Sequence, residues 1–304
     1  MRKYGFILLI SILTFSAFII SSCQKDTAST KGMLHLSLTD APIDEYDITG
    51  VYITITGLQY NQGDEWQVFE EFEGPQTFNL LNLTDGVSSP LGIFELEPGV
   101  YKQIRFMLDA PAQGSGNHAN PGCYLEFGGD PENTQPLFVP SGAQTGYKAI
   151  GEFTIPENGD LFVMADSDVR KSVVAAGNSG KFLLKPTIRL IVEDRSGNIA
   201  GTLFNTEEGI DYLVYAYGAG SYEEAEAADP VDDNPRFPNA ITSDNVELEE
   251  DEYVFFLGFL PAGIYDLVLV SQTEGVYGDV LGIVEGVDVM ERETIEVEID
   301  LDTL

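Results

Sequence analysis

The sequence predicts an all-β protein with two β-sandwich domains in tandem behind a signal peptide. Two observations favour this fold class. Short runs alternate apolar and polar residues, and clusters of Gly, Pro, Asn and Asp separate these runs as turns separate strands. The run MLHLSLTD at 33–40 is typical, because its leucines share one face of a strand while His35 and Ser37 share the other.

The chain begins with the three parts of a secretory signal peptide. Arg2 and Lys3 give it a positive start, residues 4–20 are mostly apolar, and two serines precede Cys23, where a signal peptidase needs small residues. A transmembrane helix would need about 20 apolar residues and usually a basic flank beyond them. The apolar run is shorter and ends at CQKD, so we expect residues 1–22 to be removed.

The letters IISSC resemble the lipobox of bacterial lipoproteins, which implies that the Cys23 thiol is acylated and becomes the first mature residue. Stable anchoring needs more than one acyl chain, since each buried methylene contributes about 0.8 kcal/mol. Residues 23–31 would then be a lipidated tether, with the membrane as a partner through the lipid on Cys23.

Two short motifs in the tether bear on location. The letters QKD after Cys23 resemble the export signal of Bacteroides-type lipoproteins, which implies an outer-membrane protein at the cell surface. A periplasm-facing location is the alternative. Asp26, Thr27 and Ala28 resemble the O-glycosylation site of the same bacteria.

Acidic residues dominate the charge of the chain. Its 304 residues include 50 Asp and Glu against 15 Lys and Arg, and removal of residues 1–22 leaves 13 basic residues and a net charge of −37. This charge excludes nucleic acid as a partner, and it excludes direct adhesion to an anionic membrane surface. It suits solubility or divalent cations, although acidic surfaces are also common without a specific role.

The first domain is expected to span 32–194. Turn segments such as DGVSSP and PENGD separate its strands. Cys123 begins an apolar run and is expected to be a buried thiol, because an acylated Cys23 leaves it no disulfide partner. The expected strands of this domain are 33–40, 48–60, 66–72, 101–108, 147–155, 161–165 and 182–192.

The second domain is expected to span 195–304, after a polar turn, EDRSGN, that marks the boundary near 193–198. Residues 218–251 are dense in acids and proline and are expected to form one long loop, which is functional or disordered. The expected strands of this domain are 199–204, 211–217, 253–259, 264–270 and 294–301.

One turn is repeated in the two domains. LEPGVY at 96–101 and LPAGIY at 260–265 share a leucine, a glycine and a tyrosine at equal spacing, and each is followed by an alternating strand. Gly99 and Gly263 suit a turn with positive φ. Tyr101 and Tyr265 are expected to pack at sandwich corners, as architectural residues more than ligand groups.

Calcium is the ion that the acidic segments would take, because it prefers hard oxygen ligands. Two segments are rich in such ligands, the pair Asp166 and Asp168 and the run at 229–234, and no motif requires any other cofactor. Neither of these two segments has the spacing of an EF-hand loop, so a solvated acidic loop without calcium is the alternative. The candidate calcium ligands are Asp229, Asp232, Asp233 and Asn234.

Three further residues are candidates for ligand binding. Asp40 and Asp44 flank Pro42 at a strand end, where they act as turn makers or as ligand groups on a loop. Leu213, Tyr215 and Tyr217 share one strand face and are expected in the core, which leaves Tyr222 as the tyrosine of the loop. A single ring is a poor platform for a sugar.

Enzymatic chemistry finds little support in the sequence. Two histidines, His35 and His118, do not supply a multi-histidine zinc site, and neither lies near an evident nucleophile. There is no Gly-x-Ser-x-Gly elbow and no phosphate-binding glycine loop. A glycosidase needs only two placed carboxylates, so a carboxylate-pair hydrolase is the catalytic alternative.

The order of several segments resembles a known family. LSLTDAPIDEYDITGVYITITGLQY, LLNLTDG, PGVYKQIRFML, VPSGAQTGYKAIGEFTI and KSVVAAGNSGKFLLKPTIRLIVED resemble the lipoprotein domain of unknown function 4382, over about 32–192. That family implies no activity and no catalytic residues. GNIAGTLF, FLGFLPAGIYDLVLV and IEVEIDL resemble a carboxypeptidase regulatory-like, prealbumin-like sandwich over 195–304.

These expectations combine into one functional hypothesis. The chain is predicted to be a cell-envelope lipoprotein and a non-enzymatic binding or adhesion module for a glycan or an envelope protein. Two alternatives stay open at this point, which are a structural accessory of an envelope complex and the carboxylate-pair glycoside hydrolase.

Overall fold

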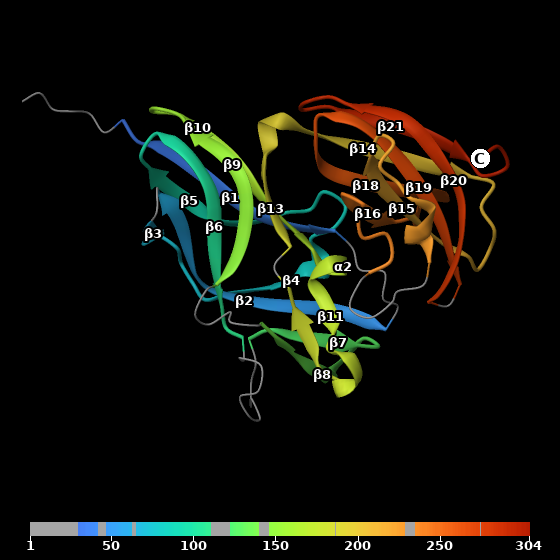
Figure 1. Ribbon diagram of the computed structural model, residues 1–304, viewed down its shortest axis with the longest axis horizontal. Coiled ribbons are helices and arrows are strands. Elements are labelled where there is room, and N and C mark those ends of the chain that lie inside the picture. The colour runs from blue at the N-terminus through green and yellow to red at the C-terminus, as the bar shows by residue number, and fades with distance from the viewer. Residues whose placement is uncertain are drawn as a thin grey trace, which may run out of the picture. The chain divides into compact units, whose positions relative to one another are not determined.

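Strands make up most of the computed structural model, which describes residues 30–41, 47–62, 65–110, 122–139, 146–185, 187–228, 235–273 and 275–304 (Figure 1). This confirms the predicted all-β class. Lys31–Leu304 forms one unit. None of the helices in these residues reaches the length and apolar content of a membrane span.

Thirteen strands of the N-terminal part form one sheet, the N-terminal sandwich. Its main order is β11-β12-β8-β7-β2-β6-β9-β13-β10-β1-β5, and β3 and β4 also pair with β2. The strands are β1 (Gly32–Ala41), β2 (Ile48–Gln62), β3 (Glu65–Val68), β4 (Gln76–Asn79), β5 (Ser89–Leu96), β6 (Gly99–Leu108), β7 (Tyr124–Phe127), β8 (Asp130–Phe138), β9 (Tyr147–Ile155), β10 (Asp160–Asp168), β11 (Val173–Ala175), β12 (Phe182–Leu184) and β13 (Ile188–Val192).

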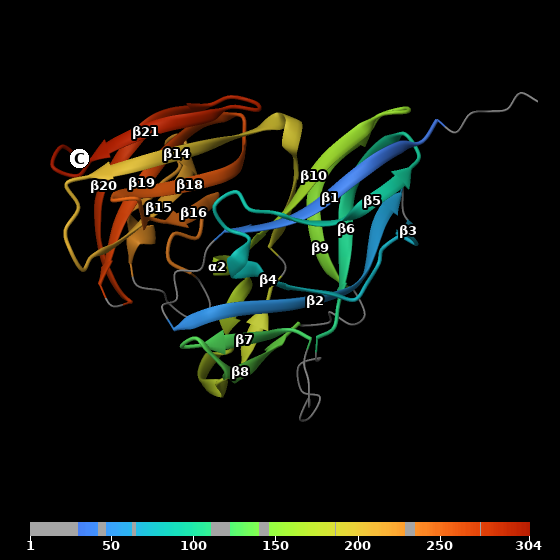
Figure 2. The same cartoon turned by 180° about the vertical axis from the view of Figure 1, so that it is seen from behind.

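The long strand β2 belongs to both halves of this sheet, as Figures 1 and 2 show. Its first residues pair with β7 and β4, and its last residues pair with β6 and β3. A register shift between Ile55 and Gly57 separates the two parts. The sheet can therefore close around one apolar core, whose fully buried side chains include Leu34, Leu36, Leu38, Val51, Ile55, Leu58, Phe94, Ile104 and Leu125.

Two four-stranded sheets form the C-terminal sandwich. One has the order β17-β18-β14-β21 and the other β16-β15-β19-β20, and their inner faces enclose a core with Ile199, Leu257 and Leu267. This agrees with the predicted prealbumin-like sandwich. The strands are β14 (Ser196–Phe204), β15 (Asp211–Gly218), β16 (Thr242–Asn245), β17 (Glu247–Glu249), β18 (Glu252–Pro261), β19 (Gly263–Thr273), β20 (Val276–Val289) and β21 (Thr294–Asp300).

Short helical turns complete the described chain. Helix α2 (Val169–Ser172) continues from β10, and the Asp168 side chain caps it by accepting from the Lys171 amide. The remaining turns are the 3-10 helices η1 (Leu80–Asn82), η2 (Gly177–Ser179), η3 (Glu193–Arg195) and η4 (Glu224–Ala227). The last strand of the N-terminal sandwich ends at Val192 and β14 begins at Ser196, and a division into folding domains at 194/195 stays a prediction.

Several expected strands have other limits in the structure. The predicted strand 182–192 is divided into two strands, β12 and β13. Of the predicted strand 66–72, only residues 66–68 are in a strand, β3. Residues 218–251 are not one loop, because η4, β16 and β17 lie within them. The long strand β20 was not predicted, because Val287 and Val289 are its only buried residues and no run of buried alternation marks it.

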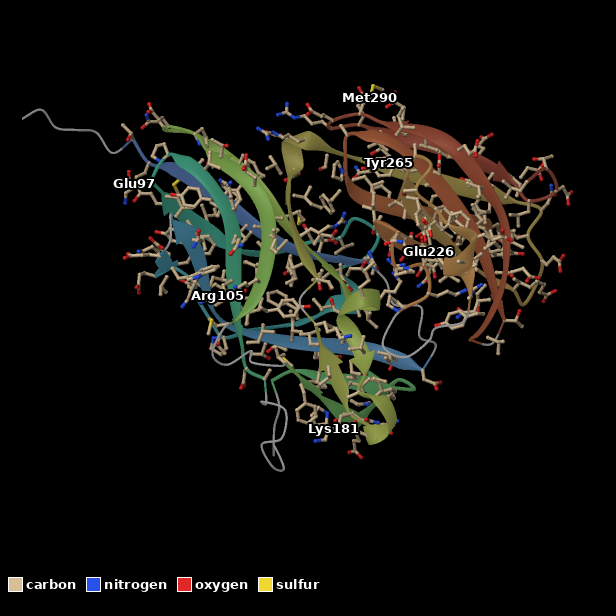
Figure 3. All side chains as sticks on the ribbon, in the orientation of Figure 1. Glu97, Arg105, Lys181, Glu226, Tyr265 and Met290 are labelled. Carbon is tan, nitrogen blue, oxygen red and sulfur yellow. The ribbon has the colours of Figure 1, made fainter. Side chains whose placement is uncertain are left out.

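The repeated turn is confirmed as an architectural device, with one correction. The Tyr101 hydroxyl donates to the Glu97 carbonyl at 2.8 Å, and the Tyr265 hydroxyl donates to the Pro261 carbonyl at 2.6 Å. Figure 3 shows Tyr265 on its strand in the C-terminal sandwich. Gly99 has a φ of 153°, but Gly263 is absent from the positive-φ glycines of the described chain, so the expectation of positive φ there was wrong.

Cys123 is a buried, free thiol, as predicted. It is 0% exposed within the core of the N-terminal sandwich. Burial raises the pKa of Cys123 to about 12, and the Asp109 carboxylate also raises it against a hydrogen bond from Thr54. Such a thiol is inert at neutral pH, so it is a packing residue.

Candidate functional site

An acidic trough lies on the outer face of the β17-β18-β14-β21 sheet and has a volume of about 460 Å³. Strand registers place its side chains in two rows. Glu247, Val254, Thr202 and Glu298 lie opposite one another on four successive strands. Phe256, Ala200 and Glu296 form the neighbouring row.

The arrangement follows from period-two alternation along each strand. On β21, Glu296 and Glu298 point outward while Val297 and Ile299 face the core. On β18, Phe255 and Leu257 face the core, which leaves Val254 and Phe256 on the outer face. The trough therefore has a floor of small and apolar side chains and a rim of glutamates on either side.

The rims are about 14 Å apart, because three strand spacings separate β17 from β21. Glu247 and Glu249 form one rim, Glu296 and Glu298 form the other, and Asp85 adds a fifth carboxylate. None of the described residues lining the trough is Lys, Arg or His. The trough is thus a negatively charged site with a narrow apolar floor.

A tight turn of the N-terminal sandwich supplies Asp85. Asp85 and Gly86 have φ of 57° and 73°, as both central residues of a type I′ turn do, and the Val87 amide donates to the Thr84 carbonyl at 2.9 Å. Glycine is required at position 86 for two reasons. Its φ is positive, and a Cβ at this position would lie 2.5 Å from the Phe256 ring. The turn therefore packs directly on β18.

A second cavity, the pit, lies beside the trough and has a volume of about 10 Å³. Asp85 and Phe256 line both cavities. The other acids of the pit are Asp40 on β1, Asp166 on β10 and Asp244 on β16. A cavity of this size holds about one water molecule.

The acids of the pit have unusual environments. Burial raises the pKa of Asp40 well above its ordinary value, and the Asp166 and Asp168 carboxylates raise it further. Burial also raises the pKa of Asp244 to about 9, and the charge of the Asp85 carboxylate adds to this. The Asp244 Oδ2 atom accepts from the Phe256 amide at 2.6 Å.

Cations beside the pit form ion pairs with Asp166, which lines it, and with Asp168. Arg189 forms an ion pair with Asp166. Arg170 and Lys171 lie 3.2 Å and 3.1 Å from Asp168. Arg170 and Lys171 also donate to the carbonyls of the 237–240 segment, at 3.0 Å and 2.5 Å, and so connect α2 to the C-terminal sandwich.

The structure brings two of the sequence candidates into this site. Asp40 and Asp166 line the pit. Asp166 pairs with Arg189, and Asp168, the other member of the predicted acidic pair, pairs with Arg170 and Lys171. Tyr222 is elsewhere, packed against the Tyr217 and Phe237 rings at 5.2 Å and 6.3 Å. Leu213, Tyr215 and Tyr217 are buried together, as predicted.

The other candidates lie outside the described residues, namely Cys23, Asp44, Asp229, Asp232, Asp233, Asn234 and the 26–28 motif. Among the residues that are described, no three His, Cys, Asp or Glu side chains are arranged to hold a metal ion. The calcium prediction on residues 229–234 therefore stays a prediction.

Sequence reasoning missed the residues that form the trough. The outward glutamates of β21 carry a readable signal, since IEVEID alternates acidic and apolar residues. Asp85 and Asp244 carry none, because TDG and TSDN look like ordinary polar turns. Their meeting depends on the packing of distant segments.

Comparisons with known proteins place the chain. Solved structures similar to it include the TIE protein of Bacillus anthracis, at 9% identity and a TM-score of 0.22, where the match covers 89% of this chain and 34% of that one. A leucine-rich repeat protein from Bacteroides thetaiotaomicron matches at 13% identity and a TM-score of 0.21, over 90% of this chain and 26% of that one. The fimbrial anchor protein Mfa2 from Porphyromonas gingivalis matches at 7% identity and a TM-score of 0.20, over 83% and 82%.

The chain spans about a third of the Bacillus anthracis protein and about a quarter of the leucine-rich repeat protein. No curated protein matches the sequence. The family described as Domain of unknown function (DUF4382) matches residues 31–186, in agreement with the resemblance of the N-terminal segments. Since this match covers more than half of the 304 residues, the chain belongs to the DUF4382 family.

Proposed function

We propose that the protein is a lipid-anchored binding protein of the cell envelope, and that the acidic trough takes a lysine-rich extended segment of a protein partner. The observation that carries this proposal is the arrangement of four glutamates and Asp85 around a floor of small and apolar side chains. Five carboxylates on one open surface repel each other, and a cationic partner relieves that repulsion.

The floor of the trough favours a peptide as the occupant. Ala200, Gly201 and Thr202 are small, so a backbone can approach the sheet closely. A segment lying between the rims can direct lysine side chains to the glutamates on both sides. A neutral glycan offers no charge to complement the carboxylates, so the peptide is favoured over the glycan.

Binding of a synthetic peptide tests the proposal. The probe is an eight-residue peptide of alternating lysine and threonine, titrated into the mature protein in detergent, with a glutamate–threonine peptide as the reference. We expect saturable binding of the lysine peptide that weakens as salt rises, because the attraction is between exposed charges. The Glu296→Gln/Glu298→Gln variant should bind at least about fivefold more weakly, since it removes one rim.

A matched variant controls for net charge. Glu70 and Glu73 are exposed on a turn away from the trough, and Glu70→Gln/Glu73→Gln changes the charge by the same amount. This control should bind like the unmodified protein. Equal loss in both variants, or no binding of the lysine peptide, would overturn the proposal.

The proposed anchoring at the cell envelope is tested separately. Acylation of Cys23 predicts that labelled fatty acid is incorporated and that the protein partitions with membranes, while Cys23→Ser abolishes both. If Cys23→Ser still matures and partitions as before, the lipid anchor is wrong. A pull-down from detergent-solubilised envelope distinguishes a binding protein from a structural accessory, because an accessory should co-purify with its complex at fixed stoichiometry.

One observation favours a second candidate, the carboxylate-pair hydrolase. Burial raises the pKa of Glu247, and Asp85 and Glu249 raise it further. A general acid needs a shift in this direction. Glu247 is exposed on the short strand β17, however, and such a side chain is poorly held for catalysis. If the unmodified protein hydrolyses aryl glycosides and Glu247→Gln does not, the hydrolase is favoured. If the unmodified protein does not hydrolyse them, the binding role is favoured.

A further inference from the structure

The pit contains an acceptor that the protein itself does not use. Asp40 is 7% exposed, and its Oδ1 atom accepts from the Val169 amide at 3.1 Å. Its Oδ2 atom is buried and has no hydrogen-bond partner within the described structure. A buried carboxyl oxygen without a hydrogen-bond partner is unfavourable, so this oxygen marks the pit as a place for a polar group of a ligand.

Two further acids meet at the same cavity from different sandwiches. Asp85 lies on the Thr84–Val87 turn and Asp244 on β16, and both side chains line the pit. Burial and the nearby Asp85 carboxylate raise the pKa of Asp244 to about 9. Asp244 therefore carries a proton at neutral pH in the empty protein.

We propose that the pit is the anchor of the trough, where the ammonium group of one lysine of the bound segment donates hydrogen bonds to Asp40 Oδ2 and to the Asp85 and Asp244 carboxylates. The inference rests on the proposed function and names the chemical group that the site selects. Asp85 lines both cavities and is exposed, so it lies on the side from which a side chain in the trough arrives.

Size and bonding select an ammonium group over other cations. A space for about one water accepts a single nitrogen with three donors, but it does not accept a planar guanidinium. Divalent ions need several oxygens at about 2.0–2.6 Å, and the described carboxylates are not arranged in such a group. Hydrogen bonds from nitrogen are longer, at about 2.7–2.9 Å.

Occupation of the pit releases a proton. The arriving ammonium favours the charged form of Asp244, so the O–H bond of this carboxyl group breaks and its proton goes to water. The neighbouring cations Arg189, Arg170 and Lys171 are already engaged by Asp166 and Asp168. The acids that line the pit around the ammonium are Asp40, Asp85 and Asp244, together with Asp166 in its ion pair with Arg189, and Glu247 lies next to Asp85.

Calorimetric titration of the mature protein in detergent tests this inference. Three peptides of the same sequence carry lysine, trimethyl-lysine or arginine. All three peptides carry the positive charge that the glutamates of the trough attract. Only the lysine peptide has a cationic group that is small and also has N–H donors. We expect the lysine peptide to bind about tenfold more tightly than the other two, as for the loss of charge-assisted hydrogen bonds.

Proton release gives a second readout. Titration in buffers of different ionisation enthalpy should show proton release from Asp244 when the lysine peptide binds, and affinity should rise by up to about tenfold per pH unit between pH 6 and pH 8. Asp244→Asn should lose both the proton release and the preference for lysine. Glu296→Gln/Glu298→Gln should bind all three peptides more weakly and keep the preference.

The outcomes separate the two proposals. If the three peptides bind equally and no proton is released, the pit is not the anchor, although the trough still binds cations. If no peptide binds, both proposals are wrong. Far-UV circular dichroism of Asp244→Asn checks that the variant is folded, and Asp85→Asn, on the exposed turn, should show the same loss of preference if Asp244→Asn does not fold.

Discussion

Tyr101 and Tyr265 occupy the same position in two copies of one turn, and each donates its hydroxyl to the carbonyl four residues earlier. The acceptors, Glu97 and Pro261, are themselves equivalent in LEPGVY and LPAGIY. Both rings are buried, at 2% and 4% exposed. The N-terminal and C-terminal sandwiches thus close one corner each by the same hydrogen bond.

Removal of either hydroxyl should destabilise the protein measurably. Tyr101→Phe and Tyr265→Phe each delete one hydrogen bond and leave a carbonyl without its donor, at a cost of about 1 kcal/mol in the free energy of unfolding. The double variant should show the sum, because the two sites share no partner. Urea unfolding measures this. Tyr52→Phe, whose ring stacks on Tyr124, is the control and should change stability by less than about 0.5 kcal/mol.

Arg170 should contribute far more than a surface cation. Its side chain is 0% exposed and binds both Asp168 and the Phe237 carbonyl. Arg170→Met leaves these acceptors buried and short of a donor, so we expect a loss of about 3–5 kcal/mol in urea unfolding. Lys102→Met is the control, because Lys102 and Glu152 form an exposed pair at 3.6 Å, worth less than about 1 kcal/mol. Similar losses in the two variants would show that Arg170 is not a structural link.

The pH dependence of stability should report Asp244. Its pKa is about 9 in the folded protein and about 3.9 in an unfolded chain. The stability that its protonated form contributes is fully present below pH 4 and is lost as pH rises toward 9, with a slope of at most about 1.4 kcal/mol per pH unit. Asp244→Asn removes this slope, so its stability relative to the unmodified protein should rise between pH 5 and pH 8.

Exposed acids provide the reference for this measurement. Asp288 is exposed on β20, and Asp288→Asn should track the unmodified protein across the same range. Asp40 and Asp166 also have raised pKa values, chiefly through burial, but they are present in all three proteins. A constant difference between Asp244→Asn and the unmodified protein would contradict the assignment.

Cys123 should be unreactive until the protein unfolds. In the Cys23→Ser protein it is the remaining cysteine, and burial holds its pKa near 12. A thiol reagent at pH 8 should label none of it in buffer and one thiol per chain in urea. Val100 is 56% exposed, so Val100→Cys should react at once and shows that the reagent is active. Rapid labelling of folded Cys123 would mean that the core opens readily.

Much of the local structure could be predicted from the sequence, because short sequence patterns identify strands and corner tyrosines. The strand at 147–155 and the buried face of Leu213, Tyr215 and Tyr217 follow directly from alternation. The pairing of β14 with β21, by contrast, joins residues 96 positions apart. Register between such distant strands is not encoded in either strand alone, so the two rims of the trough could not be predicted.

The acids of the pit show the same limit more sharply. Asp244 lies in TSDN, a polar quartet that reads as an exposed turn, yet it is 2% exposed. Its burial depends on the Thr84–Val87 turn and on β18, which come from other parts of the chain. Composition favours acids at the surface, and only the assembled packing reveals which of the 50 acids are inside.

The position of β1 between two neighbours decides how the protein would carry mechanical load. Its residues are in register with β10 at nine positions and with β5 at seven. A tension applied through Lys31 along this strand is resisted by both ladders at once, in shear, and the backbone bonds do not break one after another. A protein fixed to a surface by its N-terminus and held by a partner elsewhere would therefore fail by rupture of the whole strand and not by gradual peeling.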